Sequence, residues 1–305
     1  MVKAPLLKVT HLQKHFGKFQ ALKDIDFEIN AGEVFGFIGP NGAGKSTTIR
    51  ILLGILKASG GHATIFGHDV WQASVTIHRR IAYVPGDVYL WPNLSGGEII
   101  DLFLKLNGSH HSAKTDALIK KFELDPRKKA GTYSKGNRQK VALVAAFSMD
   151  ADFYIFDEPT SGLDPLNEQT FQNAVLDLKR QGKSVLLSSH ILSEVEKMCD
   201  RIAIIREGQI VETGTLAEMR HLTRTTVDVQ TVHPLTKLAT LEGVHGVTIR
   251  HGENHVSLAV DADQLTTVMQ YLTSCQLLTL TTTPPTLEDL FMRYYTATDQ
   301  TVEGK

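Results

Sequence analysis

Nine consecutive residues carry the pattern of a phosphate-binding loop. They read Gly39-Pro40-Asn41-Gly42-Ala43-Gly44-Lys45-Ser46-Thr47, and the first eight fit G-x-x-x-x-G-K-[ST] at every position. Glycines allow tight backbone turns, so that successive N–H groups can converge on a polyphosphate. Lys45 can reach the β- and γ-phosphates, and the hydroxyl group of Ser46 is a ligand for Mg²⁺. The pattern therefore predicts a site for a nucleoside triphosphate.

The segments on either side of this loop have the periodicity that a strand–loop–helix unit requires. Residues 34–38 form a short apolar run typical of a buried strand, and residues 49–56 are apolar at near-helical spacing. A helix that begins at the loop adds the positive end of its dipole to the phosphate site. The flanking segments therefore favour a nucleotide site over a chance match.

A second motif places two carboxylates after an apolar run. Residues 153–156 read as a buried strand, and Asp157 and Glu158 follow it. A strand that delivers a carboxylate at its C-terminal end is the Walker B arrangement, in which Asp157 would hold Mg²⁺ opposite Ser46. Glu158 is placed to polarise a water molecule against the γ-phosphate. Two acids can also cap a helix, but beside a phosphate loop we favour metal binding and hydrolysis.

The composition limits the class of protein. The 305 residues include 32 basic and 33 acidic side chains, so no net field indicates nucleic acid or anionic lipid as a partner. The two cysteines, Cys199 and Cys275, lack metal-type spacing and favour a reducing compartment. No signal-peptide core follows Met1, and no apolar stretch reaches membrane-spanning length. We expect a cytoplasmic protein without direct membrane insertion.

The ordered motifs resemble the nucleotide-binding subunits of ABC transporters, over roughly residues 5–215. This resemblance implies a P-loop ABC-type α/β fold, with a mixed sheet core and a helical subdomain at about residues 87–150. It also implies roles for three further side chains. Phe16 would stack on adenine, Asp164 would belong to the D-loop, and His190, after the apolar run 184–187, would be the switch histidine.

Two segments compete for the signature motif of this family, which is usually LSGGQ. Residues 94–98 match its letters better, but they lie too far before Asp157, because the signature opens the helix that leads into the Walker B strand. Residues 133–140 lie at the right place, and an apolar helical run follows them. We therefore assign the signature, which contacts the opposite subunit's ATP, to Ser134, Gly136 and Asn137.

The rejected segment has its own interpretation. Ser95 is predicted to be the N-cap of a helix, with Glu98 in the capping-box position.

The sequence departs from the family pattern at two places. In the assigned signature, Lys135 replaces a glycine and Asn137 a glutamine. After residues 81–85, where the family usually places a glutamine that touches the metal site, this chain has Gly86 and then Asp87. Asp87 could substitute for the glutamine, or residues 85–87 could be only a turn. The usual relay to the membrane subunit is therefore in question.

Residues 220–305 are predicted to form a second, smaller domain after an ATPase domain of residues 1–219. The expected order is strand, helix, strand, strand, helix, strand, which suggests a small α+β, ferredoxin-like domain. The ranges are 225–230, 234–241, 247–250, 255–260, 261–272 (capped by Asp261) and 277–281, with a final helix at 287–295. This domain has no catalytic constellation, so it is either regulatory or a passive dimer-stabilising appendage.

The resemblance implies an ATPase that powers a membrane transporter, more specifically an exporter, with ATP and Mg²⁺ as cofactors. Lys45, Glu158 and His190 would be the catalytic residues of a head-to-tail dimer. A transmembrane permease would hold the subunit at the inner face of the membrane, and the apolar residues 89–92 could contact it, unless Trp91 packs internally. The alternatives are a non-transport ABC ATPase and a slow, ATP-gated binding module. The sequence does not indicate the transported substrate.

Overall fold

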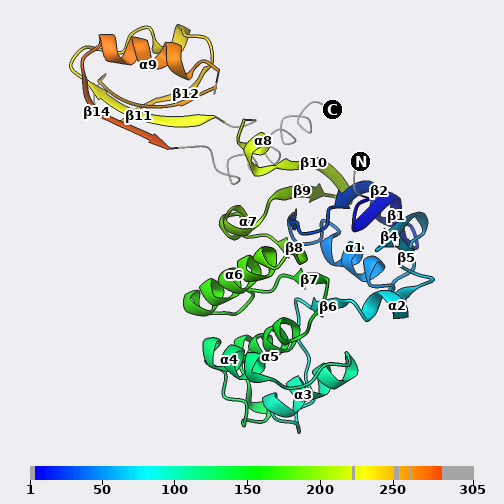
Figure 1. Cartoon of the computed structure of the whole chain (residues 1–305). Coiled ribbons are helices and arrows are strands. Elements are labelled where there is room, and N and C mark those ends of the chain that lie inside the picture. The colour runs from blue at the N-terminus through cyan, green and yellow to red at the C-terminus, as the bar shows by residue number, and fades with distance from the viewer. Residues whose placement is uncertain (1–3, 222–223, 251–253, 262, 284–305) are drawn as a thin grey trace. The chain divides into compact units, whose positions relative to one another are not determined.

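The protein is described by a computed structural model that covers residues 4–221, 224–250, 254–261 and 263–283. It divides into two compact units, Met1–Gly214 and Thr215–Lys305 (Figure 1). This division lies a few residues before the predicted boundary at 219/220.

Two sheets form the first unit. An antiparallel sheet has the order β2-β1-β4-β5, with β1 (Leu7–Phe16), β2 (Phe19–Ile29), β4 (Gly60–Ile65) and β5 (His68–Asp69). A six-stranded sheet has the order β10-β9-β3-β8-β7-β6. Its strands are β3 (Val34–Ile38), β6 (Ile81–Val84), β7 (Phe153–Asp157), β8 (Ser184–Ser189), β9 (Arg201–Arg206) and β10 (Gln209–Thr215). Strands β6, β7, β8, β3 and β9 run parallel.

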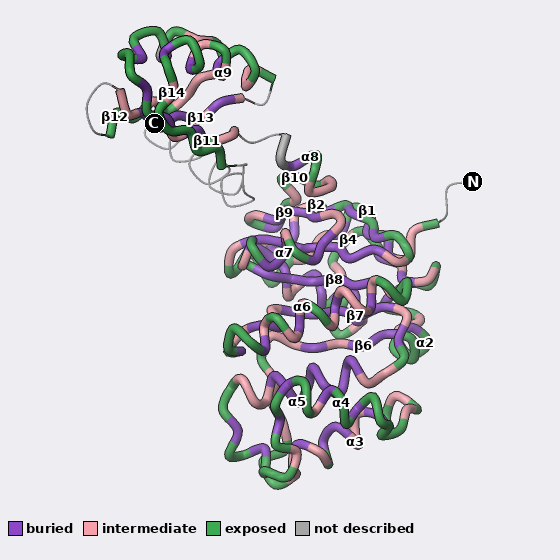
Figure 2. The backbone as a smooth tube through the Cα atoms, turned by 60° about the vertical axis from the view of Figure 1, so that its left-hand side comes forward, coloured by how far each residue is buried: buried purple, intermediate pink, exposed green. Residues whose placement is uncertain are grey.

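The central parallel strands are buried along their whole length, as the purple backbone in Figure 2 shows. Burial on both faces explains why these strands are continuous apolar runs in the sequence, without polar alternation. Because parallel strands end at a common edge, the segments that follow β3, β7 and β8 meet there. This edge brings together the phosphate loop, Glu158 and His190.

Helices cover the sheets and form the predicted helical subdomain. The first unit contains α1 (Lys45–Leu52), α2 (Ser74–His78), α3 (Gly96–Leu106), α4 (Ala113–Lys121), the 3₁₀ turn η1 (Ala130–Thr132), α5 (Lys135–Ser148), α6 (Pro165–Arg180) and α7 (Leu192–Met198). Helix α5 packs against α3 and α4. Within the described ranges, no helix combines the length and apolar character needed to cross a bilayer.

A cluster of aromatic rings joins the helical subdomain to the sheet. The ring of Phe147, on α5, lies 6.2 Å from Phe122, 5.3 Å from Phe156 and 5.9 Å from Phe171, measured between centroids. These four side chains come from the end of α4, from α5, from β7 and from α6, and all are buried. Their packing holds α5, which carries the assigned signature at its start, against the strand that carries Asp157.

The second unit is built on an antiparallel sheet with the order β12-β13-β11-β14. Its elements are α8 (Leu216–His221), β11 (Thr225–Thr231), the 3₁₀ turn η2 (Leu238–Thr240), β12 (Val244–Ile249), β13 (His255–Val260), α9 (Leu265–Ser274) and β14 (Leu277–Thr283). The first and third strands of the predicted order, β11 and β13, are the central neighbours. The buried residues Val227, Leu258 and Val268 belong to its own apolar core.

Two details of this unit correct the sequence prediction. In place of the helix expected at 234–241 there are a tight turn, closed by a hydrogen bond from the N–H of Leu238 to the carbonyl oxygen of Leu235, and the 3₁₀ turn η2; both leucines are buried without a longer helix. Asp261 does not cap α9, whose N-cap is Gln264; its carboxylate instead lies 2.8 Å from Arg224 and 2.8 Å from His245. The predicted helix at 287–295 lies outside the described residues.

Candidate nucleotide-binding site

The phosphate loop connects β3 directly to α1, as the sequence predicts. Gly44 is the N-cap of α1 with φ 115°, and Gly42 has φ 81°, in the region that favours glycine. A Cβ atom on Gly44 would lie 2.7 Å from Cδ2 of Leu22, and the positive φ would strain any other residue at this position. These two glycines therefore set the curvature of the loop.

The loop presents backbone donors without partners. Among the described residues, no protein group accepts a hydrogen bond from the N–H groups of Gly42, Gly44, Lys45 and Ser46. Unpaired backbone N–H groups at a helix N-terminus are the donors that bind phosphate oxygens. The loop is thus ready for an anionic ligand.

Three charged or titratable side chains form a continuous chain beside the loop. Nζ of Lys45, a side chain that is only 6% exposed, donates to the carbonyl oxygen of Gly39 at 2.6 Å and lies 3.0 Å from Oε1 of Glu158. The other carboxylate oxygen of Glu158, Oε2, lies 2.6 Å from Nδ1 of His190. Glu158 has φ 48°, an uncommon conformation for a residue other than glycine. The structure therefore brings all three predicted catalytic residues together.

Asp157 lies behind this chain, and a serine of the neighbouring strand orients it. Asp157 pairs with Ser188 in the β7–β8 register, and the Ser188 hydroxyl donates to Oδ1 of Asp157 at 2.5 Å. The N–H of Glu158 also donates to Oγ of Ser188, at 3.1 Å. No role was expected for Ser188, because the sequence shows a polar residue at the end of an apolar run but not that this residue faces Asp157 across the β7–β8 pairing.

Ser46 and Asp157 fit the Mg²⁺ site that the sequence predicts. A hydroxyl and a carboxylate are hard oxygen ligands, which suit this ion. Asp157 is 5% exposed, and the hydrogen bond from Ser188 leaves its second oxygen, Oδ2, without a recorded protein donor among the described residues. A buried carboxylate with one oxygen available is consistent with a cation ligand.

The assigned signature residues lie at the start of α5, the helix that leads into β7. Ser134 is the N-cap, and its Oγ accepts a hydrogen bond from the N–H of Asn137 at 3.3 Å. A Cβ atom on Gly136 would lie 2.3 Å from the carbonyl oxygen of Gly162, so only glycine fits there. The competing Ser95 caps α3 with Glu98 in a complete capping box, which confirms the predicted helix start.

The two departures from the family pattern lie close together. Lys135 donates to Oγ of Ser161 at 2.8 Å, and its Nζ is 3.8 Å from a carboxylate oxygen of Asp87. A Cβ atom on Gly86 would lie 3.2 Å from the carbonyl oxygen of Asp157. Asp87 thus contacts the signature helix, and the side-chain position of the usual glutamine stays empty beside the Walker B strand.

The remaining predicted residues lie at exposed positions. Phe16 ends β1, and its ring is 49% exposed, with Nζ of Lys14 5.0 Å from the ring centroid. Asp164 is the N-cap of α6, and its carboxylate accepts hydrogen bonds from the N–H and side-chain amide of Asn167, which lower the pKa of Asp164. Trp91 is half exposed and lies 6.1 Å from the ring of Phe103.

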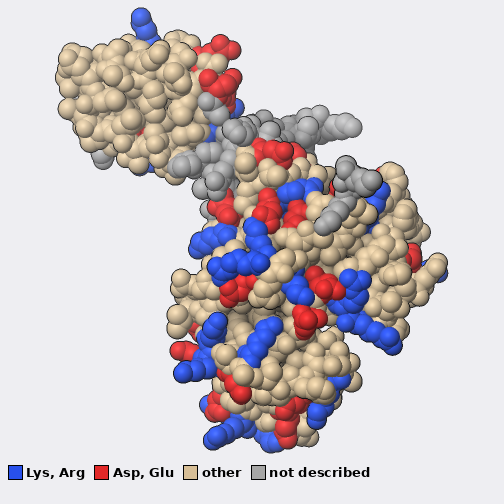
Figure 3. All heavy atoms as spheres, viewed as in Figure 1, with Lys and Arg blue, Asp and Glu red and all other residues tan. Residues whose placement is uncertain are grey.

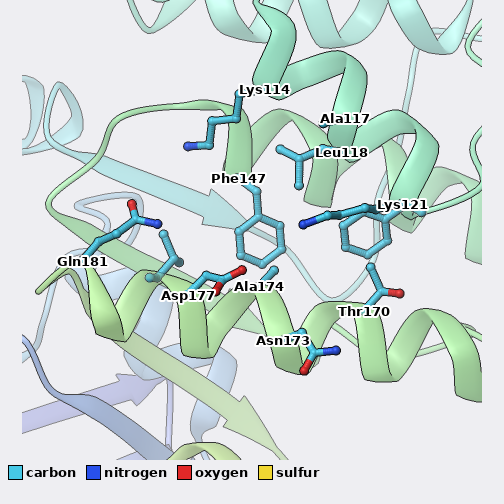
Figure 4. A pocket seen from close by; sticks show the side chains of 12 residues that line it. Lys114, Ala117, Leu118, Lys121, Phe147, Thr170, Asn173, Ala174, Asp177 and Gln181 are labelled. Carbon is cyan, nitrogen blue, oxygen red and sulfur yellow. The ribbon is translucent and has the colours of Figure 1, made fainter.

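A separate pocket of about 370 Å³ lies between α4, α5 and α6. In Figure 4, Lys121 and Asp177 point toward its centre beside Phe147. None of the predicted site residues lines it. Figure 3 shows basic and acidic side chains interspersed on the displayed face of the first unit.

The parallel sheet, the phosphate loop and the carboxylates at its edge define a P-loop nucleotide-binding protein. The family model described as "ABC transporter" matches residues 22–161. An uncharacterized ABC transporter ATP-binding protein of Synechocystis is 36% identical over 209 residues, which cover 66% of this chain and 58% of that protein. The chain thus spans less than two thirds of that relative's length.

Two proteins of Bacillus subtilis match over almost their whole lengths. The uncharacterized ABC transporter ATP-binding protein YhcH is 31% identical over 98% of both chains. The linearmycin resistance ATP-binding protein LnrL is 30% identical over 94% of this chain and 97% of its own.

Solved structures similar to this chain are ATP-binding cassettes as well. An ATP-binding subunit of an ABC transporter has a TM-score of 0.66 at 33% identity, covering 71% of this chain and 92% of its own. A dimeric ATP-binding cassette with bound ADP and Pi, 24% identical, shares the fold with a TM-score of 0.63, covering 69% of this chain and 98% of its own. The chain belongs to the family of ABC transporter ATP-binding proteins. The family resemblance and the α/β ABC-type fold class are thereby confirmed.

Proposed function

We propose that this chain binds Mg²⁺-ATP and hydrolyses it to power a membrane transporter. The observation that carries the proposal is the chain of contacts from Lys45 through Glu158 to His190 at the phosphate loop. A carboxylate held between a lysine that can bind phosphate and a histidine would be able to orient a water molecule for attack on the γ-phosphate.

The side chains act in a defined order in this proposal. Phosphate oxygens take the place of Glu158 on the ammonium group of Lys45, while the unpaired N–H groups of the loop hold the polyphosphate. The freed carboxylate then accepts a hydrogen bond from the attacking water, and His190 holds the carboxylate and the γ-phosphate in line. Ser46 and Asp157 would hold Mg²⁺, which neutralises charge on the phosphates when it is bound.

We propose a head-to-tail dimer, since the polar contacts of Ser134 and Lys135 among the described residues are with Asn137, Ser161 and Asp87 and not with the phosphate loop. Ser134, Gly136 and Asn137 would approach the nucleotide bound by Lys45 of a second copy or a close homologue. Phe16 would stack on adenine, since its ring is exposed at the end of β1. Asp164 would lie at the same interface, on the D-loop.

We propose further that the transporter is an exporter and that this subunit binds its transmembrane permease. It is supported by similarity over almost the whole chain to a protein whose name records linearmycin resistance. The exposed side chains of Tyr89 and Trp91 are candidates for the permease contact. The permease would hold this subunit at the inner face of the cell membrane, and we propose no nucleic-acid partner.

Hydrolysis by the purified protein, measured as released phosphate, tests the central claim. Glu158→Gln keeps the shape of the side chain and removes its basicity, so turnover should fall about 10²–10⁴-fold while ATP still binds. Wild-type turnover in this variant would remove Glu158 from the mechanism.

One observation favours a second candidate, a slow ATP-gated binding module. Gly86 leaves no side chain where the family pattern has a glutamine, and the main-chain oxygen of Asp157 is its neighbour. Gly86→Gln separates the two functions. An ATPase coupled to a permease should gain mainly partner-dependent stimulation, whereas a many-fold rise in the basal rate without a partner would favour the slow module.

A further inference from the structure

A buried carboxyl group lies behind the catalytic side chains. Glu194, in the first turn of α7, is 4% exposed, and its Oε2 accepts a hydrogen bond of 3.0 Å from the hydroxyl of Thr160, which is also 4% exposed. Among the described residues, Oε1 of Glu194 has no hydrogen-bond partner. Burying a carboxyl group with one unsatisfied oxygen opposes folding, so its place in the fold needs an explanation.

Each partner of this hydrogen bond is close in sequence to a catalytic residue. Thr160 lies two positions after Glu158, in the loop that joins β7 to α6, and Glu194 belongs to the helix that begins just after His190. Helices α6 and α7 also pack against each other. The Thr160–Glu194 hydrogen bond therefore ties the backbone that carries Glu158 to the backbone that carries His190.

We propose that Glu194 is a positioning residue that holds the His190 end of α7 against the loop after Glu158, through its hydrogen bond with Thr160. This inference rests on the proposed hydrolysis by Glu158 and His190. The His190 side chain is 51% exposed, so little packing around its ring fixes it. Its 2.6 Å contact with Glu158 thus depends on how the backbone around His190 is held, on one side by β8 and on the other by α7.

The surroundings of Glu194 favour its neutral form. Burial raises the pKa of this carboxyl group, and the negative charges of Glu168, on α6, and Glu158 raise it further; the Thr160 hydrogen bond and His190 act in the opposite direction. Glutamine has nearly the shape of glutamic acid, and its carbonyl oxygen can accept the same hydrogen bond from Thr160. Glu194→Gln should therefore preserve the tie.

Four variants of the full chain test the inference in an ATPase assay. Thr160→Val and Glu194→Leu should each lower kcat about tenfold and leave KM for ATP within about twofold, since the loss falls on alignment for the chemical step. The double variant should be no slower than either single one, because both remove the same hydrogen bond. Glu194→Gln should stay within about twofold of the wild-type kcat.

Thr231→Val is the matched control. Thr231 is 1% exposed and donates a hydrogen bond to a main-chain oxygen in the second unit, so it reports the general cost of losing a buried hydroxyl. An equal fall of kcat in Thr231→Val and Thr160→Val would overturn the inference. So would wild-type kcat in Thr160→Val, which leaves the buried carboxyl group in place and removes only the donor.

A measurement without turnover separates this inference from the proposed function. The imidazole NMR resonances of His190, assigned by their loss in His190→Gln, should shift in Thr160→Val and stay unchanged in Thr231→Val. If the wild-type protein does not hydrolyse ATP, the proposed function fails while this arm still tests the tie. Unchanged His190 resonances in Thr160→Val would overturn the inference even in an active enzyme.

Discussion

The two sides of the candidate site differ in what holds their side chains. On the near side, Lys45, Asp157, Glu158 and His190 are held by one another or by Ser188, at the edge of buried parallel strands. On the far side, the side chain of Ser134 has, among the described residues, only the helix that it caps as a hydrogen-bond partner. The near side is thus held by side-chain contacts within one chain, whereas no such set of contacts surrounds Ser134 in the described part of the chain. This contrast is expected of a site that two chains build together.

Substitution of the two capping serines, Ser134 and Ser95, should have the largest effect, and it tests which of them belongs to a site shared between two chains. Ser134→Arg should abolish ATP-dependent dimerisation, measured by light scattering of Glu158→Gln protein with ATP, because a bulky cation would fill the space for the γ-phosphate. Ser95→Arg is the matched control: it removes the N-cap of α3, which costs about 1 kcal/mol of stability, and should leave the dimer intact. Dimer loss only in the Ser95 variant would mean that residues 94–98 are the signature.

Removal of the Ser188 hydroxyl tests how Asp157 is held on the near side. Ser188→Ala deletes the hydroxyl that donates to Asp157 and accepts from the N–H of Glu158. We expect the Mg²⁺ concentration for half-maximal hydrolysis to rise about 10-fold or more, since partners that orient a metal ligand typically carry effects of that size. An unchanged Mg²⁺ requirement would show that Asp157 is fixed without Ser188.

The buried acid of the near side predicts a pH dependence of stability. The pKa of Glu194 is raised in the folded chain, so folding takes up a proton between the pKa of the unfolded chain and that of the folded one. The contribution to stability is fully present below the unfolded pKa and is lost as the pH rises through the folded pKa. Urea unfolding should therefore show wild type losing stability relative to Glu194→Gln as the pH rises. A constant difference between them would contradict the raised pKa.

The smallest expected effect concerns the exposed charges near Ser134. The pair of Lys135 and Asp87 is largely exposed, so Lys135→Met and Asp87→Asn should couple by no more than about 1 kcal/mol in urea unfolding. The pair of Lys129 and Glu98, of similar exposure, provides the control. Hydrolysis rates of the single and double variants give the second test. If these rates show coupling for Lys135 and Asp87 but not for Lys129 and Glu98, and if the coupling weakens as salt is added, Asp87 has a role at the nucleotide site beyond that of a turn residue.

The residues of the near side could be found in the sequence because each of its motifs is a short run of adjacent residues. The apolar run 34–38 became β3 with the same limits, and the loop and Walker B carboxylates followed from motifs on adjacent residues. The sequence did not indicate Ser188 or the Thr160–Glu194 hydrogen bond, since both depend on which strands and helices become neighbours. In the second unit, the helix predicted at 234–241 failed because two leucines three residues apart fit one 3₁₀ turn as well as a helix.

In the proposed mechanism, the ion pair between Lys45 and Glu158 would make this carboxylate a competitor of the nucleotide for Lys45. A buried ammonium group needs an anionic or polar partner, and Glu158 is that partner here; in the proposed mechanism a phosphate oxygen of ATP would take its place. The same carboxylate cannot orient water while Lys45 holds it. Binding of the triphosphate would therefore release the base that acts on it. Glu158 would be able to orient water only after the substrate has bound, so that the substrate would activate its own hydrolysis.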